Sequence, residues 1–152
     1  MDADCLIKLV KSNLKEVVCE NFSVVIPATV KEEVIDQAHE HPDAQIIREN
    51  LERRLLILHK DSSSHKKGED AVYALFREGK YDAVCSDDKK FIKRLRLFEI
   101  PYITPAVFVA ILFNDGKLGR DEAFDKLTAL SPFISDDEYQ TIRRVLQQGR
   151  KP

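Results

Sequence analysis

Long apolar runs are missing from this 152-residue sequence, and none approaches the ~20 residues that a membrane-spanning helix needs. The start of the chain also lacks the basic residues that open a secretory signal peptide, because Asp2 and Asp4 stand there. We therefore expect a soluble, cytoplasmic protein with no membrane partner.

Cysteine is scarce, and the spacing of its three positions excludes the usual zinc sites. Cys5, Cys19 and Cys85 form no Cys-x-x-Cys pair, and the four histidines add no zinc-like spacing. Each cysteine lies in or beside an apolar segment, which is typical of reduced thiols in a cytosol. No nucleophile triad stands out either.

An excess of positive charge is also absent, since 24 basic residues are set against 26 acidic ones and the formal net charge is −2. A chain of this charge does not coat nucleic acid by long-range attraction alone. Any nucleic-acid site must therefore be local.

The sequence has enough apolar residues for one compact domain, because 43% of it is hydrophobic. No internal repeat or low-complexity linker divides it. We therefore expect a single domain over residues 1–148 and a frayed tail over residues 149–152.

The stretch from Gly68 to Phe91 organises the rest of the chain. An apolar face from Val72 to Phe76, followed by Gly79 at the position of a helix C-cap, predicts a helix over residues 68–78. A short apolar run at 83–85 then predicts a buried strand. Acidic residues stand at the start of this helix and directly after this strand.

Short apolar strands alternate with helices along the rest of the chain. Further strands are predicted at 22–26, 55–58 and 101–103, and further helices end near residue 10 or cover residues 30–37, 43–53, 89–96, 106–113, 120–130 and 135–148. This alternation predicts an α/β fold, a three-layer α/β/α sandwich with a short parallel sheet and a helical C-terminal part.

Four acidic residues stand at the ends of predicted elements: Asp2, Glu33, Asp70 and Asp88. Carboxylates gathered at one edge repel each other, so a fold tolerates such a cluster mainly where it holds a cation. Oxygen ligands favour Mg²⁺ or Mn²⁺, which suits phosphodiester hydrolysis. Taken singly, each of these acids could instead cap a helix or complement its dipole.

Four segments resemble, in order, the motifs of the PIN-domain family of metal-dependent ribonucleases, which includes the VapC-type toxins. They are residues 2–7 (Asp-Ala-Asp-Cys-Leu-Ile), 30–34 (Val-Lys-Glu-Glu-Val), 68–71 (Gly-Glu-Asp-Ala) and 86–91 (Ser-Asp-Asp-Lys-Lys-Phe). The region from Ile100 to Leu146 is similar to the helical C-terminal part of one prokaryotic branch.

The resemblance implies a metal-binding and catalytic quartet of Asp2, Glu33, Asp70 and Asp88. The third position is open, because the Gly-Glu pairing favours Glu69 whereas the spacing to Asp88 and the following alanine favour Asp70; Asp70 is our first choice. Secondary acidic or water-orienting positions are Asp4, Glu69, Ser86 and Asp87, with the Ser86 hydroxyl expected to orient a metal-bound water.

Basic residues lie beside these acids in the sequence and predict a track for RNA phosphates. The candidate RNA-binding residues are Lys66, Lys67, Lys89, Lys90, Lys93 and Arg94. The alternative is an ordinary solvated helix face.

The resulting hypothesis is a divalent-metal-dependent endoribonuclease that cuts single-stranded RNA. If it is a toxin, the resemblance implies a homodimer and a small protein antitoxin as partner.

Family members carry an apolar strand before their first aspartate, whereas Met1 alone precedes Asp2 here. Two explanations are expected: either translation begins upstream of this sequence, or a frayed chain end holds Asp2 and the metal site is incomplete. The second explanation suggests a non-catalytic RNA- or protein-binding module. A phosphatase or DNA nuclease using the same carboxylates is a third possibility.

Overall fold

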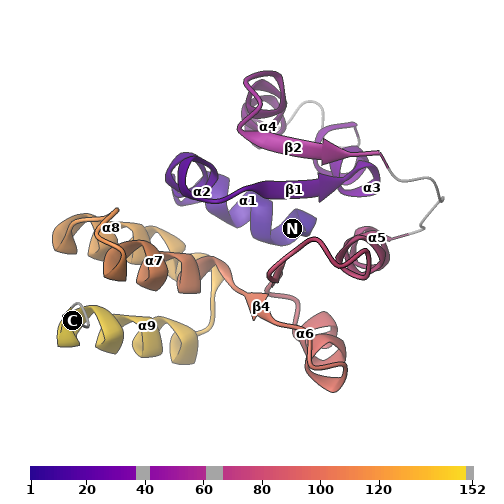
Figure 1. Ribbon diagram of the computed structural model, residues 1–152. Helices are drawn as coiled ribbons and strands as arrows, with labels where there is room; N and C mark the ends of the chain where they lie inside the picture. Colours follow the sequence, from indigo (N-terminus) through magenta and orange to yellow (C-terminus); the bar gives the residue numbers. More distant parts are fainter. Residues whose placement is uncertain (37–41, 61–66, 150–152) are drawn as a thin grey trace.

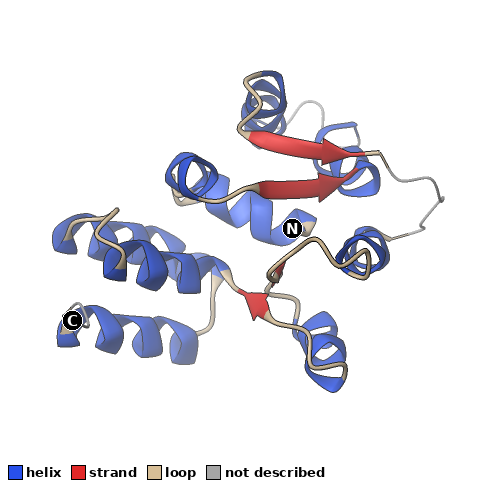
Figure 2. Cartoon of the chain, in the orientation of Figure 1, coloured by secondary structure: helices blue, strands red, loops and turns tan. Residues whose placement is uncertain are grey.

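The protein has an α/β fold in which short parallel strands are surrounded by helices (Figures 1 and 2). A computed structural model describes residues 1–36, 42–60 and 67–149. The strands are β1 (Val24–Pro27), β2 (Leu56–His59), β3 (Val84–Cys85) and β4 (Tyr102–Ile103). The helices are α1 (Ala3–Lys11), α2 (Lys15–Asn21), α3 (Ala28–Lys31), α4 (Pro42–Glu52), α5 (Gly68–Phe76), α6 (Lys89–Leu97), α7 (Pro105–Asn114), α8 (Arg120–Leu130) and α9 (Asp136–Gln148), with a π-helix η1 (Glu32–Asp36) and a 3₁₀ turn η2 (Ser131–Phe133).

The strands form two parallel pairs rather than one sheet in the part of the chain that is described. β1 pairs with β2, with Val24 opposite Leu56, and β3 pairs with β4. The chain start lies between the pairs (Figure 1). The Met1 nitrogen donates to the Val25 carbonyl at 3.0 Å, and the Asp2 N–H donates to the Cys85 carbonyl at 3.0 Å. Parallel pairing is therefore confirmed, and the first two residues bridge the two sheets.

The start of the chain is held firmly in place. Met1 is 7% exposed and Asp2 is 4% exposed, and helix α1 begins directly after them. The expectation of a frayed Asp2 was wrong, because backbone hydrogen bonds to β1 and β3 fix this segment on both sides.

Helix α1 lies at the centre of the molecule. Its apolar face buries Cys5, Leu6 and Leu9, and it contacts α4 and η1 as well as α7 and α8. One apolar core therefore runs from the strands into the C-terminal helices.

The C-terminal helices follow the sequence signals closely. Pro105 stands in the first turn of α7, and the Ser135 hydroxyl oxygen accepts from the Glu138 N–H at the start of α9. Phe108, Leu112 and Phe113 of α7 are buried within the chain and belong to its apolar core.

Several local expectations were inexact. Helix α2 was not anticipated, and the segment 30–37 is divided between α3 and η1, with Gln37 outside the described residues. Residues 150–152 of the expected frayed tail also lie outside that part. Among the described residues, no helix is long and apolar enough to cross a membrane.

Candidate metal and nucleic-acid site

Acidic residues from four elements line one pocket of about 240 Å³, which we call the acid pocket. It is lined by Asp2, Ala3, Asp4, Glu33, Lys67, Gly68, Glu69 and Asp88. Asp2 is the N-cap of α1, Asp88 is the N-cap of α6, and Glu69 stands in the first turn of α5. Helix N-termini favour negative charge, so three helix dipoles help the fold to tolerate these carboxylates.

Asp2 is the most buried of these acids. Its Oδ1 atom accepts from the Cys5 N–H at 2.9 Å, and it also forms a hydrogen bond with the Ser86 side chain. Burial raises the pKa of Asp2 from 3.8 to about 6, although both hydrogen bonds oppose that rise. Its ionised form is therefore costly unless a cation compensates for the lost water.

Glu33 reaches the pocket from the π-helix η1 and binds the start of α5. Its Oε1 atom accepts from the Gly68 N–H at 2.8 Å. A Cβ atom at position 68 would lie 2.6 Å from Glu33 Oε2. Gly68 is therefore required for this close approach of the Glu33 carboxylate to the helix N-terminus.

The pocket lining contains Glu69 and not Asp70, so of the two candidates for the third acidic position Glu69 is the one that lies at the acid pocket. Consecutive residues of an α-helix point about 100° apart, so the two side chains cannot share one direction. Asp70 Oδ1 instead binds Arg94 Nη1 at 2.7 Å, and that guanidinium lies over the Tyr73 ring. Burial, followed by the charge of Asp88, raises the pKa of Glu69.

Asp88 and Ser86 are fixed by hydrogen bonds at the start of α6. Asp88 Oδ1 accepts from the Phe91 N–H at 2.7 Å, and the Asp88 N–H donates to Ser86 Oγ at 3.2 Å. Ser86 is fully buried and is not part of the pocket lining. Its hydroxyl therefore positions Asp2 and Asp88, whereas its predicted contact with a metal-bound water is untested.

The two remaining acidic candidates, Asp4 and Asp87, lie in different places. Asp4 is exposed and lines the acid pocket, whereas Asp87 forms an ion pair with Lys8 of α1 and is not part of the lining. No local pattern predicts the Lys8 contact, because 79 positions separate the two residues. This pair ties the turn before α6 to the central helix.

The donor atoms suit a hard divalent cation. Asp2, Glu33 and Asp88 each use one carboxylate oxygen to accept from a backbone N–H. Within the described residues, no three His, Cys, Asp or Glu side chains are grouped closely enough to hold a metal ion by themselves. Mg²⁺ usually keeps several waters and binds through one or two carboxylates, so the carboxylate set fits a hydrated Mg²⁺ or Mn²⁺.

The predicted basic residues are only partly gathered at this site. Lys67 lines the acid pocket, and Lys89, Lys90 and Lys93 are exposed on α6. Arg94 is engaged with Asp70. Lys66 lies outside the described residues.

One family matches the sequence over most of its length. The family is DUF3368, a PIN domain, and the match covers residues 1–148. Neither the curated proteins nor the solved structures gave a match.

Proposed function

The chain belongs to the PIN-domain family, and on that premise we propose that it is a divalent-metal-dependent endoribonuclease acting on single-stranded RNA. PIN domains are typically nucleases, so the family indicates the general class of activity. The observation that carries the finer proposal is the acid pocket, where Asp2, Glu33, Glu69 and Asp88 from four separate elements line one cavity.

We propose that Mg²⁺ or Mn²⁺ binds among these four carboxylates, directly to one or two of them and to the others through its waters, with Glu69 in place of Asp70. The carboxylates are the ligand type that these ions prefer, and burial of Asp2 leaves a charge that a cation would stabilise. When bound, such an ion lowers the pKa of water and stabilises charge on phosphate oxygens.

Lys67 and the exposed lysines of α6 would bind the RNA backbone. Lys67 stands in the pocket lining, and Lys89 directly follows Asp88 at the start of α6. An RNA phosphate at the pocket would therefore meet a cationic side chain as well as the proposed ion, and binding would weaken with added salt.

The proposed partners follow from the family likeness. A small protein antitoxin would block the acid pocket, and the chain would form a homodimer. A cytoplasmic location is supported by the free thiols of Cys5, Cys19 and Cys85, which form no disulfide.

Cleavage of a mixed-sequence single-stranded RNA tests this proposal. We expect cleavage with Mn²⁺ and none with EDTA. Asp88→Asn and Glu69→Gln should abolish it, because each removes a charged ligand and keeps the shape of the side chain. Asp70→Asn is the matched control and should cleave like the unmodified protein.

Two outcomes would contradict the proposal. Cleavage that persists in EDTA or in Asp88→Asn would exclude a metal site built on Asp88. Loss of cleavage in Asp70→Asn with full activity in Glu69→Gln would return the third position to Asp70.

A second candidate function is a non-catalytic RNA-binding module. It is favoured by the lack, among the described residues, of three potential ligands grouped tightly enough for a metal ion. RNA retention in EDTA, lost when Lys67 and Lys89 are both changed to Glu, without cleavage under any metal condition, would establish it.

A further inference from the structure

Helix α6 ends in the two most exposed large apolar side chains of the part of the chain that is described. Leu97 is 77% exposed and Phe98 is 52% exposed. Phe98 is also the only exposed aromatic residue among the described ones. An aromatic ring left in water forgoes the free energy that its burial would bring, so the end of α6 is a candidate contact surface.

The turn after α6 keeps the Phe98 ring outside the core. The Ile100 N–H donates to the Leu95 carbonyl at 2.9 Å, and the Glu99 N–H donates to the Arg96 carbonyl at 3.1 Å. Together with the left-handed φ of 55° at Glu99, these two bonds form a Schellman motif. Leu95 and Ile100 are buried on the inner side of this motif. The backbone therefore leaves Phe98 on the solvent side in one fixed position.

The Phe98 ring rests against a second aromatic ring, which comes from α5. Its centroid lies 5.8 Å from that of Tyr73, and the two ring planes are 57° apart. The Arg94 guanidinium lies over the Tyr73 ring at 4.3 Å and is bound to Asp70. The ring of Tyr73 is therefore covered by its neighbours, whereas half of Phe98 remains accessible.

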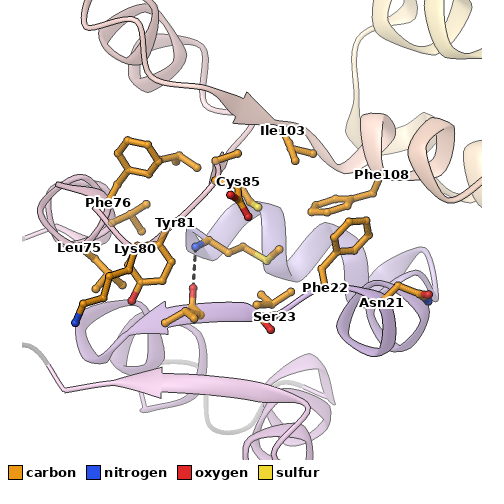
Figure 3. A pocket seen from close by; sticks show the side chains of 17 residues that line it. Asn21, Phe22, Ser23, Leu75, Phe76, Lys80, Tyr81, Cys85, Ile103 and Phe108 are labelled. Atoms are coloured by element: carbon orange, nitrogen blue, oxygen red, sulfur yellow. Dashed lines mark hydrogen bonds between the residues drawn. The ribbon is translucent and has the colours of Figure 1, made fainter. Parts of the chain in front are cut away.

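Helix α5 connects the Phe98 ring to the acid pocket. Leu75 and Phe76 of this helix line a cavity of about 420 Å³ between β1 and β3 (Figure 3). Tyr73 is not part of that lining. It stands four residues after Glu69, and residues four apart share one face of a helix. The face of α5 that carries Glu69 at the acid pocket therefore continues to Tyr73 and, through it, to Phe98.

The helix surface that leads from Asp88 to Phe98 is strongly basic. Helix α6 has the sequence Lys-Lys-Phe-Ile-Lys-Arg-Leu-Arg-Leu, in which five of nine residues are cationic and none is acidic. Lys90 and Arg94 precede Phe98 at intervals of four residues, so they share its face of the helix. The next acid, Glu99, lies beyond the helix end. Cations bind phosphates and an exposed ring accepts a base, so this combination favours single-stranded nucleic acid over an apolar protein surface.

We propose that the Phe98 ring stacks on one base of a bound single-stranded RNA, while Lys90 and Arg94 contact phosphates between this base and the acid pocket. The RNA is the substrate of the proposed function, on which this inference rests. Bases inside a duplex are already stacked on their neighbours, so the ring selects unpaired bases.

The length of α6 limits how far this base lies from the acid pocket. From Asp88 to Phe98 the helix rises by about 15 Å, at ~1.5 Å per residue. A stacked strand advances by about 3.4 Å per nucleotide, and an extended strand advances by more. The base on Phe98 is therefore at most about four nucleotides from the phosphate at the acid pocket.

Binding of a short single-stranded RNA in EDTA tests the proposal, because no metal-dependent cleavage occurs there. Phe98→Leu keeps an apolar side chain against Tyr73 but has no ring, and it should weaken binding by about fivefold or more. Phe98→Tyr keeps the ring and should bind like the unmodified protein. Leu97→Ala is the matched control, since it shortens the more exposed neighbour, and it should also bind normally.

The salt dependence of binding separates stacking from phosphate contacts. Phe98→Leu removes no charge, so the slope of log affinity against log salt should stay the same. Lys90→Ala removes one phosphate contact, so the slope should become shallower by about 0.7.

A tryptophan at position 98 reports on the stack directly. The chain contains no tryptophan, so Phe98→Trp introduces a single fluorescent reporter. Its emission should fall when the single-stranded RNA binds, and a duplex of the same sequence should change it little. Leu97→Trp should respond less than Phe98→Trp, because the proposed base lies on position 98.

Two results would overturn the proposal: equal binding by Phe98→Leu and the unmodified protein, or no RNA binding by the unmodified protein in EDTA. Equal losses in Phe98→Leu and Leu97→Ala would overturn it in favour of an apolar contact with a protein. Cleavage is not measured, so failure of the stack leaves the nuclease proposal standing. Likewise, a lack of cleavage with Mn²⁺ leaves a positive binding result standing.

Discussion

The half of the chain that carries the strands and the half formed by α7, α8 and α9 are stabilised differently. In the helical half the buried side chains are apolar, such as Leu112, Leu127 and Leu146. In the strand half, Asp2 and Ser86 are buried among short strands that form two separate pairs. Burial of a carboxylate lowers the stability of the fold, whereas burial of apolar side chains raises it. The buried Asp2 is therefore a cost in the strand half that the apolar helical half does not carry.

This difference indicates where the function lies. Sites that break the local rules of folding are often functional, because their cost must be balanced elsewhere. The raised pKa of Asp2 and the close approach of Glu33 to Gly68 both occur at the acid pocket. We infer that the stability contributed by the C-terminal helices offsets the cost of burying carboxylates at the acid pocket.

The largest expected effect comes from opening a cavity in the helical half. Leu112 is fully buried, so Leu112→Ala should destabilise the protein by about 2–5 kcal/mol. Urea unfolding measures this change. A loss below 0.5 kcal/mol, roughly that of a surface substitution, would show that the helical half is not the stabilising part.

Asp2→Asn should stabilise the protein at neutral pH, whereas Leu112→Ala destabilises it. The native pKa of about 6 exceeds the ordinary value of 3.8, so the native state binds more protons than the unfolded state between these values. The wild-type protein therefore loses stability as pH rises from about 4 to 6. Asn carries no charge, so the variant should gain up to about 3 kcal/mol above pH 6 and little below pH 4.

Urea unfolding at pH 4 and pH 7 distinguishes a stability change that depends on the charge of Asp2 from one that is the same at every pH. Asn also keeps a good N-cap oxygen for the Cys5 N–H, so the start of α1 should be preserved. An equal change at both pH values would contradict the assigned burial cost of the ionised Asp2.

Removing a helix cap in the helical half should have a smaller effect. Ser135 Oγ accepts from the Glu138 N–H at the start of α9, and Ser135→Ala should cost about 1 kcal/mol. The melting temperature measures it. Because α9 lies outside the acid pocket, any rise in melting temperature produced by Mn²⁺ should be the same as in the unmodified protein.

Gly68→Ala should change stability least, but it should weaken the response to the metal ion. The new Cβ would meet Glu33 Oε2, which is the end of a flexible side chain and can move, so the cost should stay below about 1 kcal/mol. The displaced Glu33 would lose its hydrogen bond to residue 68. The rise in melting temperature with Mn²⁺ should therefore shrink in Gly68→Ala but not in Ser135→Ala.

The sequence predicted the helical half well because its signals are local. The apolar period over residues 120–130 and the Ser135 cap act within a few positions, and α8 and α9 have the predicted bounds apart from the cap residue itself. The predicted helix at residue 68 and the strand before Asp88 were likewise found, since glycine punctuation marks both.

The strand half could be predicted only in outline. The existence of parallel strands follows from the alternation of elements, but the split into two sheets depends on where Met1 and Asp2 lie between distant segments. The spacing to Asp88 and the following alanine favoured Asp70 over Glu69. In the structure Glu69 lines the acid pocket, whereas Asp70 contacts Arg94, and neither direction could be read from the sequence.

Melting curves with and without Mn²⁺ test the central claim, that the acid pocket binds a divalent ion through Glu69 and Asp88. An ion that binds the folded state alone raises the melting temperature. We predict this rise in the unmodified protein and in Asp70→Asn, and its loss in Glu69→Gln and Asp88→Asn. Identical curves with and without the ion in the unmodified protein would contradict the claim.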